Sequence, residues 1–296
     1  MGADDDVGFI NLIRHTLFKQ LDVTLNDTLI SDSSNSYAYR SLIETELSYG
    51  EAIKNSQLSL GLYTQDQAEE MDSLTQNEGL TTRKAYTNLS KSVTLITKPH
   101  SDIFFQDRYL LNGLDLKMKL IRNTDSFCLM ASGQSRYKVV LEDISYFARK
   151  VKLNPSIQMK HIEQMDKQLK LAIYPIRRVA MKPINVPVGS LSLVEENLFS
   201  GQLPQKIVIG FVDSSAFEGS SEKNPFNFQH FGMNICQLVI DGKQVPASLA
   251  SQTLRKMNRC AVASLCCNLR GRLSDTIVFV YPETTLITVI LSWLSI

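Results

Sequence analysis

The sequence lacks the features that mark most enzymes and most nucleic-acid-binding proteins. Its net charge is only +1, so no overall basic field draws it to DNA or to an anionic membrane. No GxSxG, Walker or HExxH string occurs. The five cysteines form no CxxC pair and the four histidines are scattered, whereas zinc ligands usually come in closely spaced pairs. We therefore expect reduced thiols in an intracellular chain, and no catalytic, cofactor-binding or metal-binding residues.

The N-terminus lacks a targeting pattern. "MGADDDVGFI" is acidic and does not run from basic to apolar residues, as a secretory signal does. Gly2 is not followed by the Ser or Thr that myristoylation requires, because Asp6 stands at that position. What is present is 296 residues with 44% apolar and 21% charged content, which predicts a soluble globular protein with one large domain or two ordinary ones.

Short alternating segments between turn residues dominate the sequence. Leu17 to Ile30 alternates on both sides of Asn26-Asp27 and predicts a hairpin, and "ICQLVIDGKQV" at Ile235 to Val245 predicts a second one around Asp241-Gly242. We expect further strands in "VTLITK", "SDIFFQ", "LDLKMKLIR", "YKVVLEDISYFARKVKL", "YPIRRVAMKPINVPV" and "QKIVIGFVD".

Helical signals are few. Apolar residues at helical spacing predict a helix in "RSLIETELSYG", closed by Gly50, and a second helix follows Pro155. Residues 64 to 92 are polar and predict a surface excursion with at most short helices. Many strands with one or two helices predict an all-β fold of repeated antiparallel sandwiches, because a βαβ chain needs a helix after nearly every strand.

Several long strings between Val7 and Val245 are distinctive. They are "LFKQLDVTLNDTLIS", "YAYRSLIETELSYG", "DIFFQDRYLLNGLDLKMKLIRNTDSFCLM", "YPIRR", "LFSGQLPQKIVIGFVDSSAFEG" and "KNPFNFQHFGMNICQLVIDGKQ". They keep a fixed order, which is more specific than a short motif. In this order they resemble the major capsid protein of Maverick/Polinton elements and adintovirus-like viruses, in the double jelly-roll lineage.

The resemblance implies a double jelly-roll that is incomplete in both rolls. Residues 1–155 would form a first roll without its initial strands, residues 156–172 a connecting helix, and residues 173–246 a partial second roll. The implied function is that of a structural shell protein located in the virion. Its partners would be itself, as a trimeric capsomer, and neighbouring capsomers or a minor capsid protein, without a specific nucleic-acid site.

The tail at residues 247–296 does not match the resemblance, and we expect it to be foreign to the fold, as in a decayed or mis-joined endogenous copy. Within it, Thr276 to Ile296 has the length of a membrane span and follows Arg270 and Arg272, although Pro282 and Glu283 interrupt it. The alternative function is therefore a non-enzymatic β-sandwich binding module, anchored to a membrane by this segment.

A few polar residues are candidates for a metal site, an acid–base pair or contacts with DNA. His100, Asp102 and Asp107 could be metal ligands or an acid–base pair, but without an identifiable third ligand nearby we interpret them as turn and strand-end residues. Glu44 and Glu46 fall on different sides of a helix and do not form a paired-carboxylate site. The basic pairs Arg149-Lys150 and Arg177-Arg178 could contact packaged DNA, and we interpret them as solvated charges.

Overall fold

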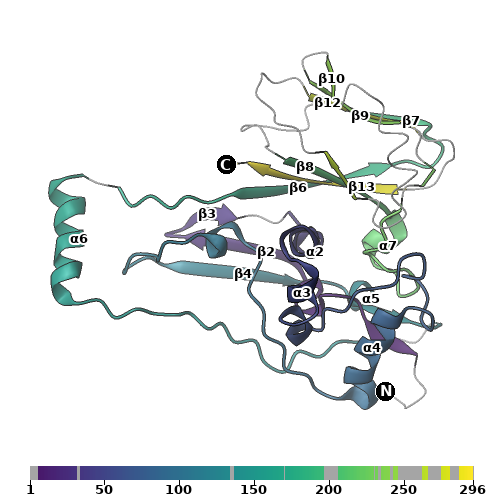
Figure 1. The fold of residues 1–296 in the computed structure, drawn as a ribbon, viewed down its shortest axis with the longest axis horizontal. Helices are drawn as coiled ribbons and strands as arrows, with labels where there is room; N and C mark the ends of the chain where they lie inside the picture. The colour runs from purple at the N-terminus through teal and green to yellow at the C-terminus, as the bar shows by residue number, and fades with distance from the viewer. Residues whose placement is uncertain are drawn as a thin grey trace.

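A computed structural model describes residues 6–31, 34–133, 137–169, 171–196, 206–229, 231–232, 235–240, 243–245, 262–265, 275–280 and 287–295. All strand pairs among these residues are antiparallel. They form two small sheets in the first half of the chain and two four-stranded sheets in the second half (Figure 1).

The first half contains a three-stranded and a two-stranded sheet. The larger sheet has the order β3 (Thr28–Ser31), β2 (Phe18–Leu25) and β4 (Leu116–Arg122), and the smaller one pairs β1 (Val7–Phe9) with β5 (Leu129–Ala131).

The predicted first hairpin is confirmed by the pairing of β2 with β3. At its turn, Asn26 and Asp27 have φ values of 45° and 62°, the left-handed pair that a two-residue hairpin loop requires. The backbone N–H of Asn26 also donates to the carbonyl of Asp115 at 2.9 Å, which ties the turn to the start of β4.

In the first half, helices and irregular segments occupy several positions where the sequence predicted strands. "VTLITK" has no regular structure and "SDIFFQ" contains a 3₁₀ helix, because a short apolar run does not by itself fix a strand. The elements of this part are α1 (Ile13–Thr16), α2 (Tyr37–Ser48), α3 (Glu51–Lys54), η1 (Leu58–Gly61), α4 (Glu78–Thr87), η2 (Asn88–Ser90), η3 (Asp102–Phe105) and α5 (Asp125–Cys128).

The helix predicted in this region is confirmed as α2, but the predicted C-terminal capping by Gly50 is not. Tyr49 follows the helix in an extended conformation, and Gly50, with φ −75°, precedes α3 instead of closing α2 in the left-handed region.

The second half is a sandwich with the strand order of a jelly roll. One sheet has the order β11 (Val262–Leu265), β8 (Lys206–Asp213), β13 (Ile287–Ser295) and β6 (Arg178–Val186). The other has the order β10 (Lys243–Val245), β9 (Ile235–Ile240), β12 (Asp275–Val280) and β7 (Ser192–Glu196). The chain alternates between the sheets except at the β9–β10 hairpin, which confirms the second predicted hairpin. Eight strands in two such sheets are the jelly-roll arrangement.

The described strands of the tail belong to this sandwich, which corrects the expectation that residues 247–296 lie outside the fold. Strand β13 pairs with β6 and β8, β12 pairs with β7 and β9, and β11 pairs with β8. Within the segment 276–296, which the sequence suggested as a membrane span, the described residues form the strands β12 and β13. No helix in the described part of the chain has the length and apolarity of a membrane span.

The helix predicted after Pro155 is confirmed as α6 (Pro155–Lys167) and ends before residue 172, whereas its role as a connection between two rolls stays a prediction. Its N-cap is Asn154, whose side chain accepts from the backbone N–H of Ser156 at 3.1 Å, and proline occupies the first helical position. Residues 137–153, predicted as a strand, run to α6 without regular structure. In Figure 1 the helix stands apart at one end of the molecule, reached by one extended segment and left by another.

One hydrophobic core joins the two halves. Val208 and Val212 of β8 pack in a cluster with Ile10, Tyr39 and further buried residues of the first half. The alternate residues of β8, Ile207, Ile209 and Phe211, are buried as well. Strand β8 is therefore covered on both faces, which explains its continuous apolar sequence. A short helix, α7 (Ser214–Glu218), follows it directly.

Candidate functional site

The first candidate site is a buried ionic cluster centred on Arg40 of α2, whose side chain is 2% exposed. Its guanidinium donates to Glu44 at 3.0 Å, to Asp102 at 2.5 Å and to the Ser31 hydroxyl at 3.2 Å. Burial lowers the pKa of Arg40, but the charges of Glu44 and Asp102 outweigh it, and the pKa is raised. The cation therefore keeps its charge in the interior.

Asp102 connects this cluster to the second half of the chain. The carboxylate oxygen that accepts from Arg40 also accepts from the backbone N–H of Val179, in β6, at 3.2 Å. The cluster consequently links α2 and η3 to the first strand of the second sandwich.

Two histidines lie next to this cluster. The ring of His100 contacts Glu44 through Nδ1 at 2.6 Å, and the ring of His15 contacts the Tyr37 hydroxyl at 2.9 Å and the Thr97 hydroxyl at 2.8 Å. The two imidazole centroids are 4.8 Å apart. Burial, together with the nearby His100 and Arg14, holds the pKa of His15 well below its usual range. His15 is therefore neutral near pH 7.

Glu44 joins the histidines to Arg40. Burial raises the pKa of Glu44, but hydrogen bonds and charge from His100 and Arg40 outweigh it, and the pKa is lowered. Burial raises the pKa of Tyr37. The polar groups of this cluster are directed at each other. Such an arrangement positions α2.

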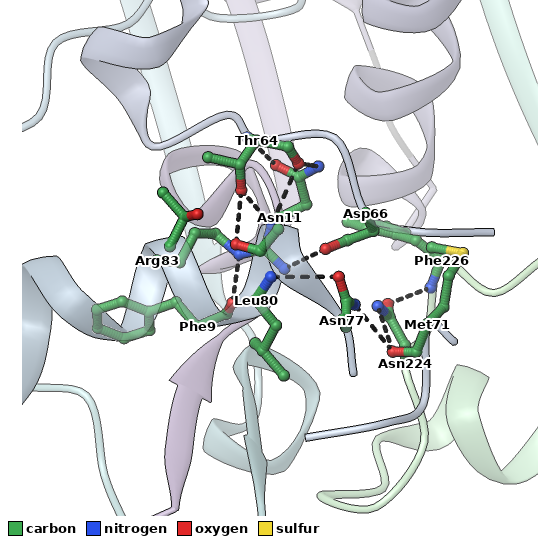
Figure 2. A network of polar contacts seen from close by, with 12 residues as sticks. Phe9, Asn11, Thr64, Asp66, Met71, Asn77, Leu80, Arg83, Asn224 and Phe226 are labelled. Atoms are coloured by element: carbon green, nitrogen blue, oxygen red, sulfur yellow. Dashed lines mark hydrogen bonds and ion pairs between the residues drawn. The ribbon is translucent and has the colours of Figure 1, made fainter. Parts of the chain in front are cut away.

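The second candidate site is a polar network around Arg83 of α4, which Figure 2 shows from close by. The Arg83 side chain is fully buried and donates to the Phe9 carbonyl at 2.8 Å, to the Thr64 hydroxyl at 2.6 Å and to Asp66 at 2.7 Å. The Asn11 amide donates to the Thr64 carbonyl at 2.6 Å. These bonds fix α4 against β1 and the segment after η1.

The same network reaches the second half through asparagines. Asn77 caps α4 by accepting from Leu80 N–H at 3.3 Å, and its amide donates to the Met71 carbonyl at 3.4 Å (Figure 2). Asn224 donates to the same carbonyl at 3.3 Å and accepts from Phe226 N–H at 3.0 Å. Met71 thus accepts from both halves of the chain.

The residues singled out in the sequence do not come together as one site. His100, in an irregular segment, and Asp102, at the start of η3, are each 5% exposed, whereas Asp107 is exposed. Glu44 and Glu46 have different partners, Glu46 pairing with Lys54. Among the described residues, no three His, Cys, Asp or Glu side chains are placed to hold a metal ion.

The remaining candidates are placed as follows. Arg149, Lys150, Arg177 and Arg178 are exposed at either side of α6. Burial raises the pKa of the Cys128 thiol to about 12, so this cysteine is a buried thiol rather than a reactive thiolate. His230, Cys260, Cys266 and Cys267 lie outside the described residues.

The sequence analysis missed the two buried arginines. Arg40 stands one helical turn before Glu44, and this spacing of opposite charges beside apolar residues was a usable signal. Arg83 has no such signal, because its partners Phe9, Thr64 and Asp66 are distant in the sequence.

No protein-family model matches the chain. An uncharacterized protein of Caenorhabditis elegans is 26% identical over 242 residues, which cover 80% of this chain and 55% of the relative. The chain thus spans about half the length of that curated relative. Among solved structures, the crystal structure of the STIV MCP matches 99% of this chain and 83% of its own chain, with 10% identity and a TM-score of 0.41.

Proposed function

We propose that this chain is a structural shell subunit of the double jelly-roll type, from a Maverick/Polinton-like element. The observation that carries the proposal is the strand order of residues 178–295, in which eight strands alternate between two sheets as in a jelly roll. The fold alone does not assign a function. The capsid-like strings between Val7 and Val245 add the assignment to a shell protein.

The hairpins support the same proposal. The β2–β3 hairpin lies in the first half and the β9–β10 hairpin in the second, as expected if each half derives from one roll. The two buried polar clusters act between the halves, because Asp102 binds β6 and Met71 accepts from Asn224. A rigid two-part block is what tiling of a shell requires, and self-association into trimeric capsomers follows from the proposal.

Electron microscopy of the purified chain tests this function. We expect regular sheets or closed particles at high protein concentration. A matched variant, Val289→Pro, places proline in β13, which is paired on both sides, and should abolish these assemblies. Val194→Pro is the control, because β7 is an edge strand of its sheet and should tolerate the change better.

Genomic context distinguishes the shell subunit from a β-sandwich binding module. A shell gene should lie near genes for a protein-primed DNA polymerase, an integrase, a packaging ATPase and a cysteine protease. A locus without these genes, together with a chain that forms no ordered assembly at any concentration, would favour the binding module and refute the shell.

A further inference from the structure

One part of the chain projects from the rest and exposes its apolar side chains. Residues 147–171, here called the arm, comprise α6 and the extended segments beside it, and stand at one end of the molecule in Figure 1. No residue of α6 is buried. Phe147, Leu169 and Leu171 are 89%, 82% and 86% exposed. Met159 and Ile162, on α6, are 69% and 52% exposed. The arm is therefore open to a partner along its length.

The exposed apolar area is large enough for a stable interface. Summed over its eight large apolar residues, the arm presents on the order of 1,000 Å², compared with about 800 Å² that each partner buries in a standard interface. The eight residues are Phe147, Val151, Ile157, Met159, Ile162, Met165, Leu169 and Leu171. The largest apolar patch on a typical monomer is about 300–600 Å². The arm exceeds this amount in a segment with little other structure, which indicates that a partner covers it.

The base of the arm is anchored, so its projection is built into the fold. On the N-terminal side, Val139 is buried and its N–H donates to Asp125 at 3.1 Å, and the ring of Tyr146 lies 6.2 Å from that of Phe104. On the C-terminal side, the Tyr174 hydroxyl accepts from the N–H of Leu111 at 3.0 Å. Between these anchors, the described arm residues make no hydrogen bond or ion pair to the body of the chain.

Charge identifies the class of partner. The arm contains six Lys and Arg residues and two acidic residues, which gives it a charge of +4. Because the whole chain carries +1, the body carries −3. The arm of one copy is therefore electrostatically complementary to the body of another. In addition, β3 and β4 are the edges of the described three-stranded sheet, and extended arm segments can add to such an edge.

We propose that the arm is an exchange element, which in the assembled state lies on the body of a second copy of this chain. The inference rests on the proposed function for its partner and deepens it by naming the surface through which copies associate. Each copy gives its arm to a neighbour and receives one, so the apolar side chains of the arm are buried only in the assembly.

Light scattering after size-exclusion chromatography tests the inference over a range of concentrations. We expect the full chain to reach a multiple of 33.3 kDa, and the variant Phe147→Ser/Leu171→Ser to associate at least tenfold more weakly. The control is Leu60→Ser/Tyr109→Ser, which removes side chains that are 70% and 68% exposed but lie outside the arm, and it should associate like the wild type. Because all four residues are exposed, circular dichroism should show that both variants fold.

Hydrogen exchange supplies a second measurement. Amides of residues 147–171 should exchange quickly in the dilute chain and become protected, by tenfold or more, when it associates. A wild-type chain that stays at 33.3 kDa, an arm variant that associates normally, or an arm protected only by duplex DNA or phosphatidylserine vesicles would each overturn the inference.

The failures of the inference and of the proposed function can be told apart. Ordered particles that survive the arm substitutions would leave the shell function standing and refute the arm. Association through the arm without ordered particles would support the arm and refute the shell function.

Discussion

Removing the buried Arg83 cation should destabilise the first half of the chain strongly. In Arg83→Met, the apolar stem is largely kept, but the bonds to Phe9, Thr64 and Asp66 are lost. The Asp66 carboxylate is 3% exposed, and one of its oxygens already has no hydrogen-bond partner among the described residues. Leaving a buried charge unpaired costs about 3–5 kcal/mol of unfolding free energy. Because most domains have only about 5–15 kcal/mol in total, this loss is easily measured.

The assay is urea unfolding followed by circular dichroism, arranged as a double-mutant cycle with Asp66→Leu. We expect the double variant to be more stable than Arg83→Met alone, because the orphaned carboxylate is then gone. Lys167→Met is the control: its ion pair with Glu163 is exposed and should be worth less than about 0.5 kcal/mol. A loss below about 1 kcal/mol in Arg83→Met, or strictly additive effects, would refute the reasoning.

Three further predictions concern other positions. Since burial lowers the pKa of His15, the unfolded chain binds more protons than the folded chain below pH 6.5. As the pH is lowered through this range, the unfolding free energy should fall by up to about 1.4 kcal/mol per pH unit. Urea midpoints at pH 7.5 and 5.5 should differ less in His15→Gln than in the wild type, and an equal difference would contradict the assignment. Gly210→Ala should lower the unfolding free energy by about 1–3 kcal/mol in the same assay, because the added Cβ would lie 2.8 Å from the Phe228 ring. At Gly113 an added Cβ would meet no neighbouring atom, and the strain of Gly113→Ala would come from the φ of 87° instead. Asp27→Gly should raise the unfolding free energy by about 0.5 kcal/mol, and with it the thermal midpoint, since glycine adopts the φ of 62° without strain. An unchanged midpoint would argue against this turn geometry.

Local patterns predicted the hairpins, α6 and β8 because each depends on neighbouring residues. The Asn26-Asp27 turn fixes one hairpin, and Asn154 followed by Pro155 starts α6. The first half was less predictable, because its buried polar residues bind partners far away in the sequence. Arg40 meets Asp102 across 62 positions, and Arg83 meets Phe9 across 74.

The place of the tail in the fold could not be predicted from its sequence either. Its strings did not match the resemblance, so composition alone suggested a foreign segment. The pairing of β13 with β6 and β8 depends on sheet order, which no short window of sequence contains. The candidate site was equally hidden, because the ring centroids of His15 in α1 and His100, just before η3, lie 4.8 Å apart although 85 residues separate them in the sequence.

The position of β13 between β6 and β8 has a consequence for biosynthesis. These two strands are synthesised long before Ile287–Ser295, yet in the sheet they are separated by it. A ribosome-bound chain can form the β2–β3 hairpin at once, but its second sandwich must wait with an open gap until residue 295 has left the exit tunnel. During that interval the edges of β6 and β8 that pair with β13 are unpaired. Chaperones that bind nascent chains should therefore engage this protein while residues 247–295 are being translated, and slowing elongation over these codons should not speed folding of the sandwich.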